Sequence, residues 1–214
     1  MHNGAKPPST AVLVFGDRPT PAALTGLPTH RPDDLDAAVH CYRRLVVIGD
    51  DADLAGVLTR LLRADRLDIE VGYATSRRTR ATRVYRLGAG RRAARRARRG
   101  TAHRVPLIRD ETGTVIVGRA SWLPAAGPQL HGEAVVDDTV LFDGEVAGVC
   151  IEPTLQLPGL RAALDTRPWR RWVSGRAAQL GTTGAVVVRD GVAAPRSVRR
   201  ASFYRHVEGW LLVR

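Results

Sequence analysis

In the first third of the chain, short strand-like segments alternate with segments whose apolar residues are spaced for one face of a helix. Residues 11–15 and 45–48 are short apolar runs of the kind that form buried strands, and residues 67–73 also read as a strand. Residues 34–44 and 51–64 lie between them and carry their apolar side chains on one helical face. This order of strand, helix, strand, helix and strand predicts a small parallel α/β lobe over residues 11–76.

Residues 105–214 follow a different pattern, in which short apolar runs are separated by turn residues. Three pairs typical of hairpin turns, at residues 112–113, 143–144 and 190–191, lie between such runs. We therefore expect an antiparallel β-sandwich lobe, so that the whole chain is of the class α/β plus all-β. The runs cover residues 105–108, 114–119, 134–142, 145–151, 185–189, 197–204 and 210–213.

The positive charge of the chain is concentrated in the segment between these two lobes. Residues 77–104 contain twelve arginines and no acidic residue, and the protein's net charge is also +12. Elsewhere the basic and acidic residues balance. A helix over residues 91–99 is expected, because Ala and Arg both favour helices, and Gly100 would end it. We expect anion binding by the arginines of this segment, namely Arg77, Arg78, Arg80, Arg91, Arg92, Arg95, Arg96 and Arg99.

Other features of the composition narrow the setting in which the protein works. Residues 1–10 read as a flexible tail without the apolar stretch of a signal peptide. The longest uninterrupted aliphatic run is too short to span a bilayer, and two cysteines do not make a disulfide scaffold. We expect a cytoplasmic protein, with peripheral contact at the inner membrane face as an alternative.

The order of an α/β lobe and then a β-rich lobe resembles the diacylglycerol kinase and NAD kinase superfamily, and bacterial lipid kinases in particular. The family's glycine-rich turn, GGDGT, has its counterpart in Gly49-Asp50-Asp51-Ala52-Asp53, where Gly49 and Asp51 match. The family's late DGE turn is similar to Asp190-Gly191-Val192, without the glutamate. The resemblance implies nucleotide binding at Gly49 and Asp51, with Asp51 and Asp190 as catalytic candidates.

Departures from the family pattern point to a degenerate nucleotide site. A glycine-rich turn binds phosphate through open backbone N–H groups, whereas this turn carries three carboxylates. Two unit charges 4 Å apart repel by about 4 kcal/mol at an effective dielectric of 20. Mg²⁺ held by Asp51 could bridge the carboxylates to a phosphate. The same residues could instead form an acidic first helical turn, which the helix dipole favours.

These observations lead to one interpretation and two alternatives. The first is a diacylglycerol kinase-like protein that has lost ordinary ATP chemistry and binds a phosphorylated ligand or an anionic lipid surface through residues 77–104. The second is an active lipid or nucleotide kinase that uses ATP and Mg²⁺. The third is a nucleic-acid-binding module built on the arginine-rich helix, although few aromatic side chains accompany those arginines.

Overall fold

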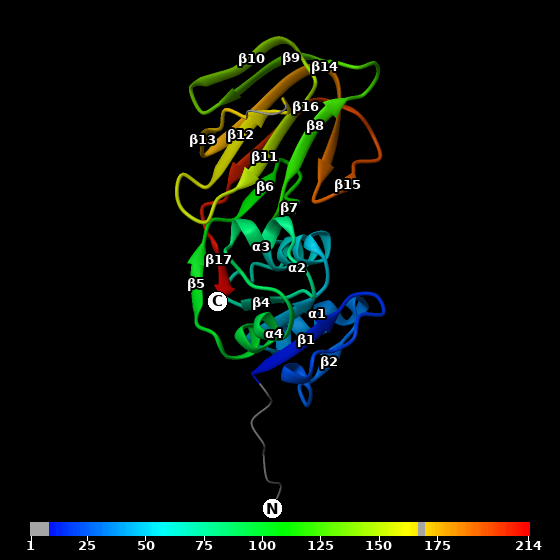
Figure 1. The fold of residues 1–214 in the computed structure, drawn as a ribbon, viewed down its shortest axis with the longest axis vertical. Coiled ribbons are helices and arrows are strands. Elements are labelled where there is room, and N and C mark those ends of the chain that lie inside the picture. The colour runs from blue at the N-terminus through cyan, green and yellow to red at the C-terminus, as the bar shows by residue number, and fades with distance from the viewer. Residues whose placement is uncertain (1–8, 167–169) are drawn as a thin grey trace, which may run out of the picture.

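The computed structural model describes residues 9–166 and 170–214, which form two lobes stacked end to end (Figure 1). The expected tail at residues 1–10 falls almost wholly outside the described residues. The first lobe contains a sheet in the order β2-β1-β3-β4-β17-β5, parallel except for β5. Its strands are β1 (Thr10–Val14), β2 (Thr29–His30), β3 (Arg44–Ile48), β4 (Glu70–Ala74), β5 (Ala102–Val105) and β17 (Trp210–Val213).

Helices cover both faces of this sheet. Successive residues of a strand point to opposite sides, so the buried strands present apolar side chains on both faces, and each face packs against helices. Leu13, Val47 and Val71 belong to the core beneath α1 (Leu35–Cys41) and α2 (Asp51–Arg63). Val12 and Val46 belong to a second cluster, under α4 (Gly90–Arg99) and the short 3-10 helix at Ala22–Leu24. The two helices expected from apolar spacing are therefore confirmed, as is the parallel pairing of β3 with both β1 and β4.

The second lobe is built around one large antiparallel sheet, with eleven strands among the described residues. Its core contains Trp122 and Phe203, whose ring centroids lie 6.0 Å apart. The strands are β6 (Ile108–Asp110), β7 (Val115–Ile116), β8 (Ala120–Pro124), β9 (Leu130–Val136), β10 (Thr139–Val146), β11 (Val149–Pro153), β12 (Leu160–Leu164), β13 (Val173–Gly175), β14 (Ala177–Arg189), β15 (Val192–Ala193) and β16 (Val198–Arg205).

Two details of this lobe differ from the sequence expectation. Asp143 and Gly144 lie inside β10, and the turn that joins β9 to β10 is instead at Asp137 and Asp138. The expected hairpin turn at residues 143–144 is therefore wrong, whereas the turn at residues 190–191 joins β14 to β15 as expected. The last strand, β17, leaves the antiparallel sheet and pairs in parallel with β4 of the first lobe.

The chain therefore crosses between the lobes twice, from β5 to β6 and from β16 back to β17. A direct hydrogen bond also joins the lobes, from the backbone N–H of Val115 to the buried Thr59 hydroxyl of α2 at 2.9 Å. No helix among the described residues is long and apolar enough to cross a membrane. The fold thus places α2 and the short helix α3 (Arg80–Val84) against the inner end of the β lobe.

A candidate anion-binding cleft between the lobes

The loop that resembles a nucleotide-binding turn is closed by its own carboxylates. Asp50 caps α2 by accepting from the Asp53 N–H at 3.1 Å, and the Asp50 N–H donates to Asp53 at 2.8 Å. Arg18 pairs with both carboxylates, at 3.2 and 3.3 Å. Burial and the nearby Asp50 raise the pKa of Asp53, against the opposing effect of the Asp50 backbone N–H. A Cβ on Gly49 would lie 2.6 Å from Asp53, so this turn contains little space beside the helix end.

Asp51 is held by neighbours from two other elements. Its carboxylate accepts from the Tyr73 hydroxyl at 3.1 Å and from the Ala81 N–H of α3 at 3.0 Å. Burial, followed by the charge of Asp51, raises the pKa of Tyr73, so the phenol stays protonated as a donor. No group of three or more His, Cys, Asp and Glu side chains that could hold a metal ion exists within residues 9–166 and 170–214. A metal role for Asp51 stays a prediction.

Asp190, at the turn after β14, lies beside Asp51 as the two catalytic candidates would require. A Cβ built on Gly118 would lie 2.9 Å from Asp51 Oδ2 and 3.0 Å from Asp190 Oδ1, so both carboxylates border one small space. Asp190 accepts the N–H groups of Val117, Gly118 and Arg119 at 2.7–2.9 Å. Burial raises its pKa to about 7, although these three donors act in the opposite direction. Asp190 therefore fixes the segment that carries Arg119.

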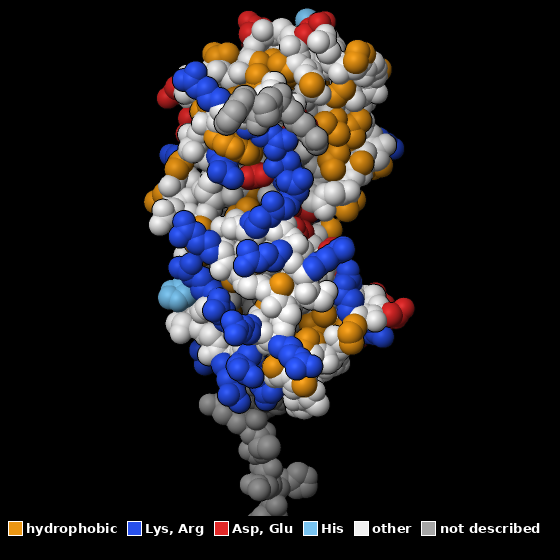
Figure 2. Space-filling view, viewed as in Figure 1, with side chains coloured by type: hydrophobic (Ala, Val, Ile, Leu, Met, Phe, Trp, Pro, Cys, Tyr) orange, Lys and Arg blue, Asp and Glu red, His pale blue; other side chains and the backbone are white. Residues whose placement is uncertain are grey.

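A cleft of about 570 Å³ opens between α3 and the loop that follows β11. Its lining is strongly cationic, with a single carboxylate, and the space-filling view shows basic side chains continuing over both lobes on this face (Figure 2). Apolar and neutral residues of the β11–β12 connection form its other wall. The charged residues lining the cleft are Arg80, Arg83, Arg86, Arg119, Arg161 and Glu152.

Glu152 organises the cationic side of this cleft. Its side chain is 10% exposed and accepts from Arg119 through Nε at 3.0 Å and Nη2 at 2.5 Å. The other carboxylate oxygen accepts from Arg161 through Nε at 3.2 Å and Nη2 at 2.7 Å. Arg80 Nη1 is 4.0 Å away. Burial alone would raise the pKa of Glu152, but these arginines outweigh it and hold the pKa below its ordinary value.

The geometry of the arginines leaves donors free for a ligand. Both Arg119 and Arg161 bind Glu152 by one edge, so the Nη1 group of each has no hydrogen-bond partner among the described residues. Trp172 fixes the plane of Arg161, whose guanidinium carbon lies 4.2 Å from the indole ring centroid. Burial and the neighbouring Arg119 lower the pKa of Arg80, which shows how closely cations gather here.

The predicted anion-binding arginines do not share one site. Arg80 alone reaches the cleft, while Arg77 and Arg78 are exposed in the loop before α3. Arg78 lines a separate hollow together with Arg92 and Arg96. The remaining five lie on the outer face of α4, where they are exposed and form no ion pair with the described residues: Arg91, Arg92, Arg95, Arg96 and Arg99.

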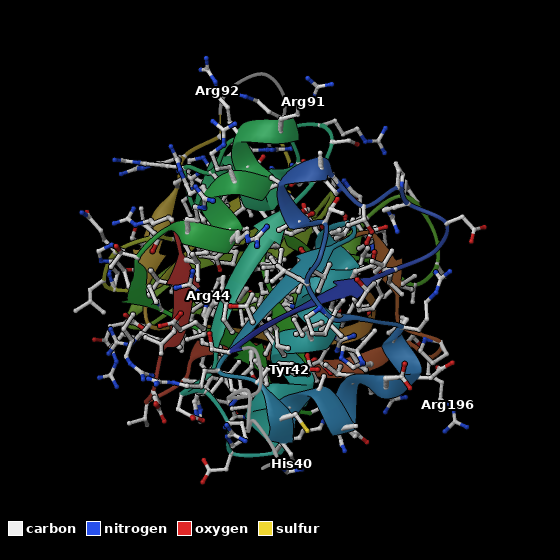
Figure 3. The ribbon with its side chains drawn as sticks, turned by 90° about the horizontal axis from the view of Figure 1, so that it is seen from below. His40, Tyr42, Arg44, Arg91, Arg92 and Arg196 are labelled. Atoms are coloured by element: carbon white, nitrogen blue, oxygen red, sulfur yellow. The ribbon has the colours of Figure 1, made fainter. Side chains whose placement is uncertain are left out.

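The helix α4 is more amphipathic than its charge suggests. Ala93, Ala94 and Ala97 form its buried face, and Ala97 meets β4 closely enough that a Cβ on Gly72 would lie 2.8 Å away. Arg91 and Arg92 extend outward from the helix, whereas Arg44 lies beneath it (Figure 3). The arginines therefore occupy only the outer face of α4, because its small alanines let the other face pack on the sheet.

Four functional residues of the cleft lie outside the arginine-rich segment and were not predicted from the sequence: Arg119, Glu152, Arg161 and Trp172. They come from the residue before β8, from β11 and β12, and from the segment before β13, so no local motif joins them. Glu152 gave the one indication in the sequence, because it is a charged residue in an otherwise apolar run. The strand Val149–Pro153 is buried throughout, and a buried carboxylate requires a partner of opposite charge.

Comparison with known proteins identifies the fold. No family model and no curated protein sequence matches the chain. A diacylglycerol kinase from Bacillus anthracis superposes with a TM-score of 0.68 and 10% identity, covering 96% of each chain. An NAD kinase from Archaeoglobus fulgidus, solved in complex with ATP, gives 0.61 and 13%, covering 96% of this chain and 93% of its own. Yeast NADH kinase, complexed with NADH, gives 0.58 and 8%, covering 97% and 83%. The protein therefore has a diacylglycerol kinase and NAD kinase-like fold over nearly its whole length.

Proposed function

We propose that this protein binds a phosphorylated small molecule in the cleft between its lobes and does not transfer phosphate from ATP. The observation that carries the proposal is the charge of the cleft, where five arginines face one glutamate that two of them already neutralise. Cations gathered around a space of this size favour an anionic ligand, because the ligand relieves their mutual repulsion.

The arrangement of these arginines suits phosphate in particular. A guanidinium offers planar, paired donors that match the oxygens of a phosphate group. Glu152 and Trp172 hold two guanidinium groups in fixed orientations, so little side-chain entropy is lost when a ligand binds them. Arg80, Arg83 and Arg86 are exposed along the opposite wall and supply further charge.

The absence of phosphate transfer rests on the turn after β3. Asp50 and Asp53 cap α2 with their own side chains, and Asp51 lies within the same turn. This helix end therefore presents negative charge where a nucleotide's phosphates would need positive charge, and it does not fit the phosphate chain of ATP. The rival function is an active kinase in which Asp51 holds Mg²⁺ and Asp190 assists, and it predicts ATP turnover that Asp51→Asn abolishes.

A thermal-shift panel of phosphorylated sugars, glycerol phosphate, nucleoside mono- and triphosphates and inorganic pyrophosphate tests the proposal. A ligand at one hundred times its Kd should add about 2.7 kcal/mol of stability. The variant Arg80→Gln/Arg86→Gln should weaken the best ligand at least tenfold, since hydrogen bonds to charged groups contribute about 1.5–3 kcal/mol each. Arg196→Gln removes an exposed arginine outside the cleft and serves as the control.

Two results contradict this proposal. One is a panel in which no phosphorylated compound stabilises the protein. The other is ATP-dependent phosphorylation of any substrate that survives Arg80→Gln/Arg86→Gln and disappears in Asp51→Asn, because it would return the chemistry to the turn after β3.

A further inference from the structure

Two exposed aliphatic side chains from distant parts of the chain line one groove beside the cleft. Leu157, in the β11–β12 connection, is 72% exposed, and Val207, in the β16–β17 connection, is fully exposed. Both line one shallow groove, and the two connections run side by side at the same edge of the molecule (Figure 1). The other two exposed large aliphatics among the described residues, Val140 and Val192, lie on strands β10 and β15, and neither lines this groove.

Arginines surround this pair of aliphatic side chains. Arg104 and Arg205 line the groove together with Leu157 and Val207. The groove and the cleft share a wall, since Leu155, Gln156 and Leu157 line both, so the cleft arginines Arg83 and Arg86 lie on its other side. We call Leu157, Val207 and the four arginines Arg83, Arg86, Arg104 and Arg205 the cleft edge.

The carboxylates near the cleft edge are already neutralised. Glu152 is the only acidic residue among those lining the groove and the cleft, and it is bound by Arg119 and Arg161. Glu208 follows Val207 and pairs with Arg104 at 2.6 Å. Arg83 and Arg86 have no acidic partner among the described residues, so the edge combines protruding aliphatic groups with unbalanced positive charge.

We infer that the cleft edge docks on an anionic lipid bilayer, with Leu157 and Val207 entering the headgroup region and the arginines contacting lipid phosphates. Moving aliphatic side chains out of water into the apolar part of a bilayer lowers the free energy. Basic residues near an anionic leaflet are attracted to it electrostatically. The phosphates of a nucleic acid would also pair with the arginines, but a nucleic acid provides no apolar environment in which Leu157 and Val207 could be buried. The inference deepens the proposed function, because docking here would present phosphorylated lipid headgroups to the cleft.

Cosedimentation with vesicles of phosphatidylcholine, with and without phosphatidylglycerol, tests this docking. The full-length protein should bind the anionic vesicles and bind the neutral ones weakly. The edge variant Leu157→Gln/Val207→Thr should lower its partition onto anionic vesicles by about tenfold or more, since each buried aliphatic side chain contributes substantially. Val140→Thr/Val192→Thr changes the two exposed aliphatics elsewhere in the molecule and should bind like the parent.

Three outcomes overturn docking at the cleft edge: equal binding by the edge variant and the parent, equal loss in both double variants, or displacement from vesicles by duplex DNA at comparable phosphate concentration. Loss of vesicle binding in Arg91→Gln/Arg92→Gln with an unaffected edge variant would move the surface to α4. Glycerol phosphate binding by the edge variant, measured in solution, separates the two proposals. If glycerol phosphate binds but the protein does not dock on vesicles through the cleft edge, the docking inference fails and the proposed function stands. If the parent does not bind glycerol phosphate or any other phosphorylated compound, the proposed function fails.

Discussion

Replacing Glu152 by glutamine should both destabilise the protein and make its stability depend on added anions. The buried carboxylate accepts four hydrogen bonds from Arg119 and Arg161, and Arg80 lies 4.0 Å away. Glutamine keeps the shape of the side chain but removes the negative charge and turns one acceptor into a donor. Three guanidinium groups would then surround a neutral amide.

The size of the effect follows from how deeply each partner is buried. Arg119 is 16% exposed, whereas Arg161 and Arg80 are 41% and 48% exposed and are screened by solvent. Removing one partner of a buried ion pair costs about 3–5 kcal/mol, and only one of these pairs is well buried, so we expect about 3 kcal/mol. A chain of this size loses about 2–4 °C in Tm per kcal/mol, which predicts a fall of about 6–12 °C.

Thermal unfolding with and without phosphate is the assay. Glu208→Gln removes a carboxylate that pairs with Arg104 on the surface, and it should cost less than about 1 kcal/mol. Inorganic phosphate should stabilise Glu152→Gln more than it stabilises the parent, because the variant cleft carries one more uncompensated positive charge. Rescue by phosphate distinguishes an anion site from an ordinary packing defect.

The pH dependence has a defined sign. The arginines lower the folded pKa of Glu152 below its ordinary value of 4.5. Its contribution to the free energy of unfolding is therefore complete above pH 4.5 and is lost as the pH falls through the lower folded value. The Tm difference between the parent and Glu152→Gln should narrow in acid. A difference that stays constant in acid, or a variant as stable as Glu208→Gln, would refute this account of the cluster.

Three further predictions concern other parts of the molecule. Gly72→Ala should destabilise by about 1–3 kcal/mol in chemical denaturation, because its Cβ would overlap Ala97 of α4. Arg91→Gln/Arg92→Gln/Arg95→Gln/Arg96→Gln should leave the Tm nearly unchanged, while any binding to duplex DNA weakens and its salt dependence becomes shallower. Since burial raises the pKa of Asp190 to about 7, the parent should lose stability as the pH rises from 4 through 7. Asp190→Ala should be less stable at every pH and should lack that slope.

The first lobe could be predicted because its elements are determined locally. Four apolar residues repeat at helical spacing, and all lie in the core beneath α2: Leu54, Val57, Leu58 and Leu61. In the second lobe, the turn after β14 is also determined locally, by the Asp190-Gly191 pair. The Asp143-Gly144 pair does not form a turn, because both residues pair with β9, opposite Glu133 and Gly132. Gly144 adopts a positive φ inside β10, so residue types typical of a hairpin turn lie within a strand.

The cleft could not be predicted, since its residues converge only after distant strands pair. Arg119 and Glu152 come together because β8 pairs with β11, and Arg161 follows because β12 pairs with β11. Most of the predicted anion-binding arginines lie on α4, but none of these lines the cleft. The arginine-rich segment contributes only three arginines to the cleft, from α3 and the residues just after it. Charge counting locates an excess of cations but not the neighbours that orient them.

Calorimetric titration of glycerol phosphate into the parent, Arg80→Gln/Arg86→Gln and Asp51→Asn tests whether the cleft is the anion site. The parent and Asp51→Asn should bind with similar affinity, because Asp51 lies in the capped turn of α2 outside the cleft lining. The cleft variant should bind at least tenfold more weakly. The opposite pattern, with binding lost in Asp51→Asn and retained in Arg80→Gln/Arg86→Gln, would contradict an anion site in the cleft and place the ligand at the nucleotide-like turn.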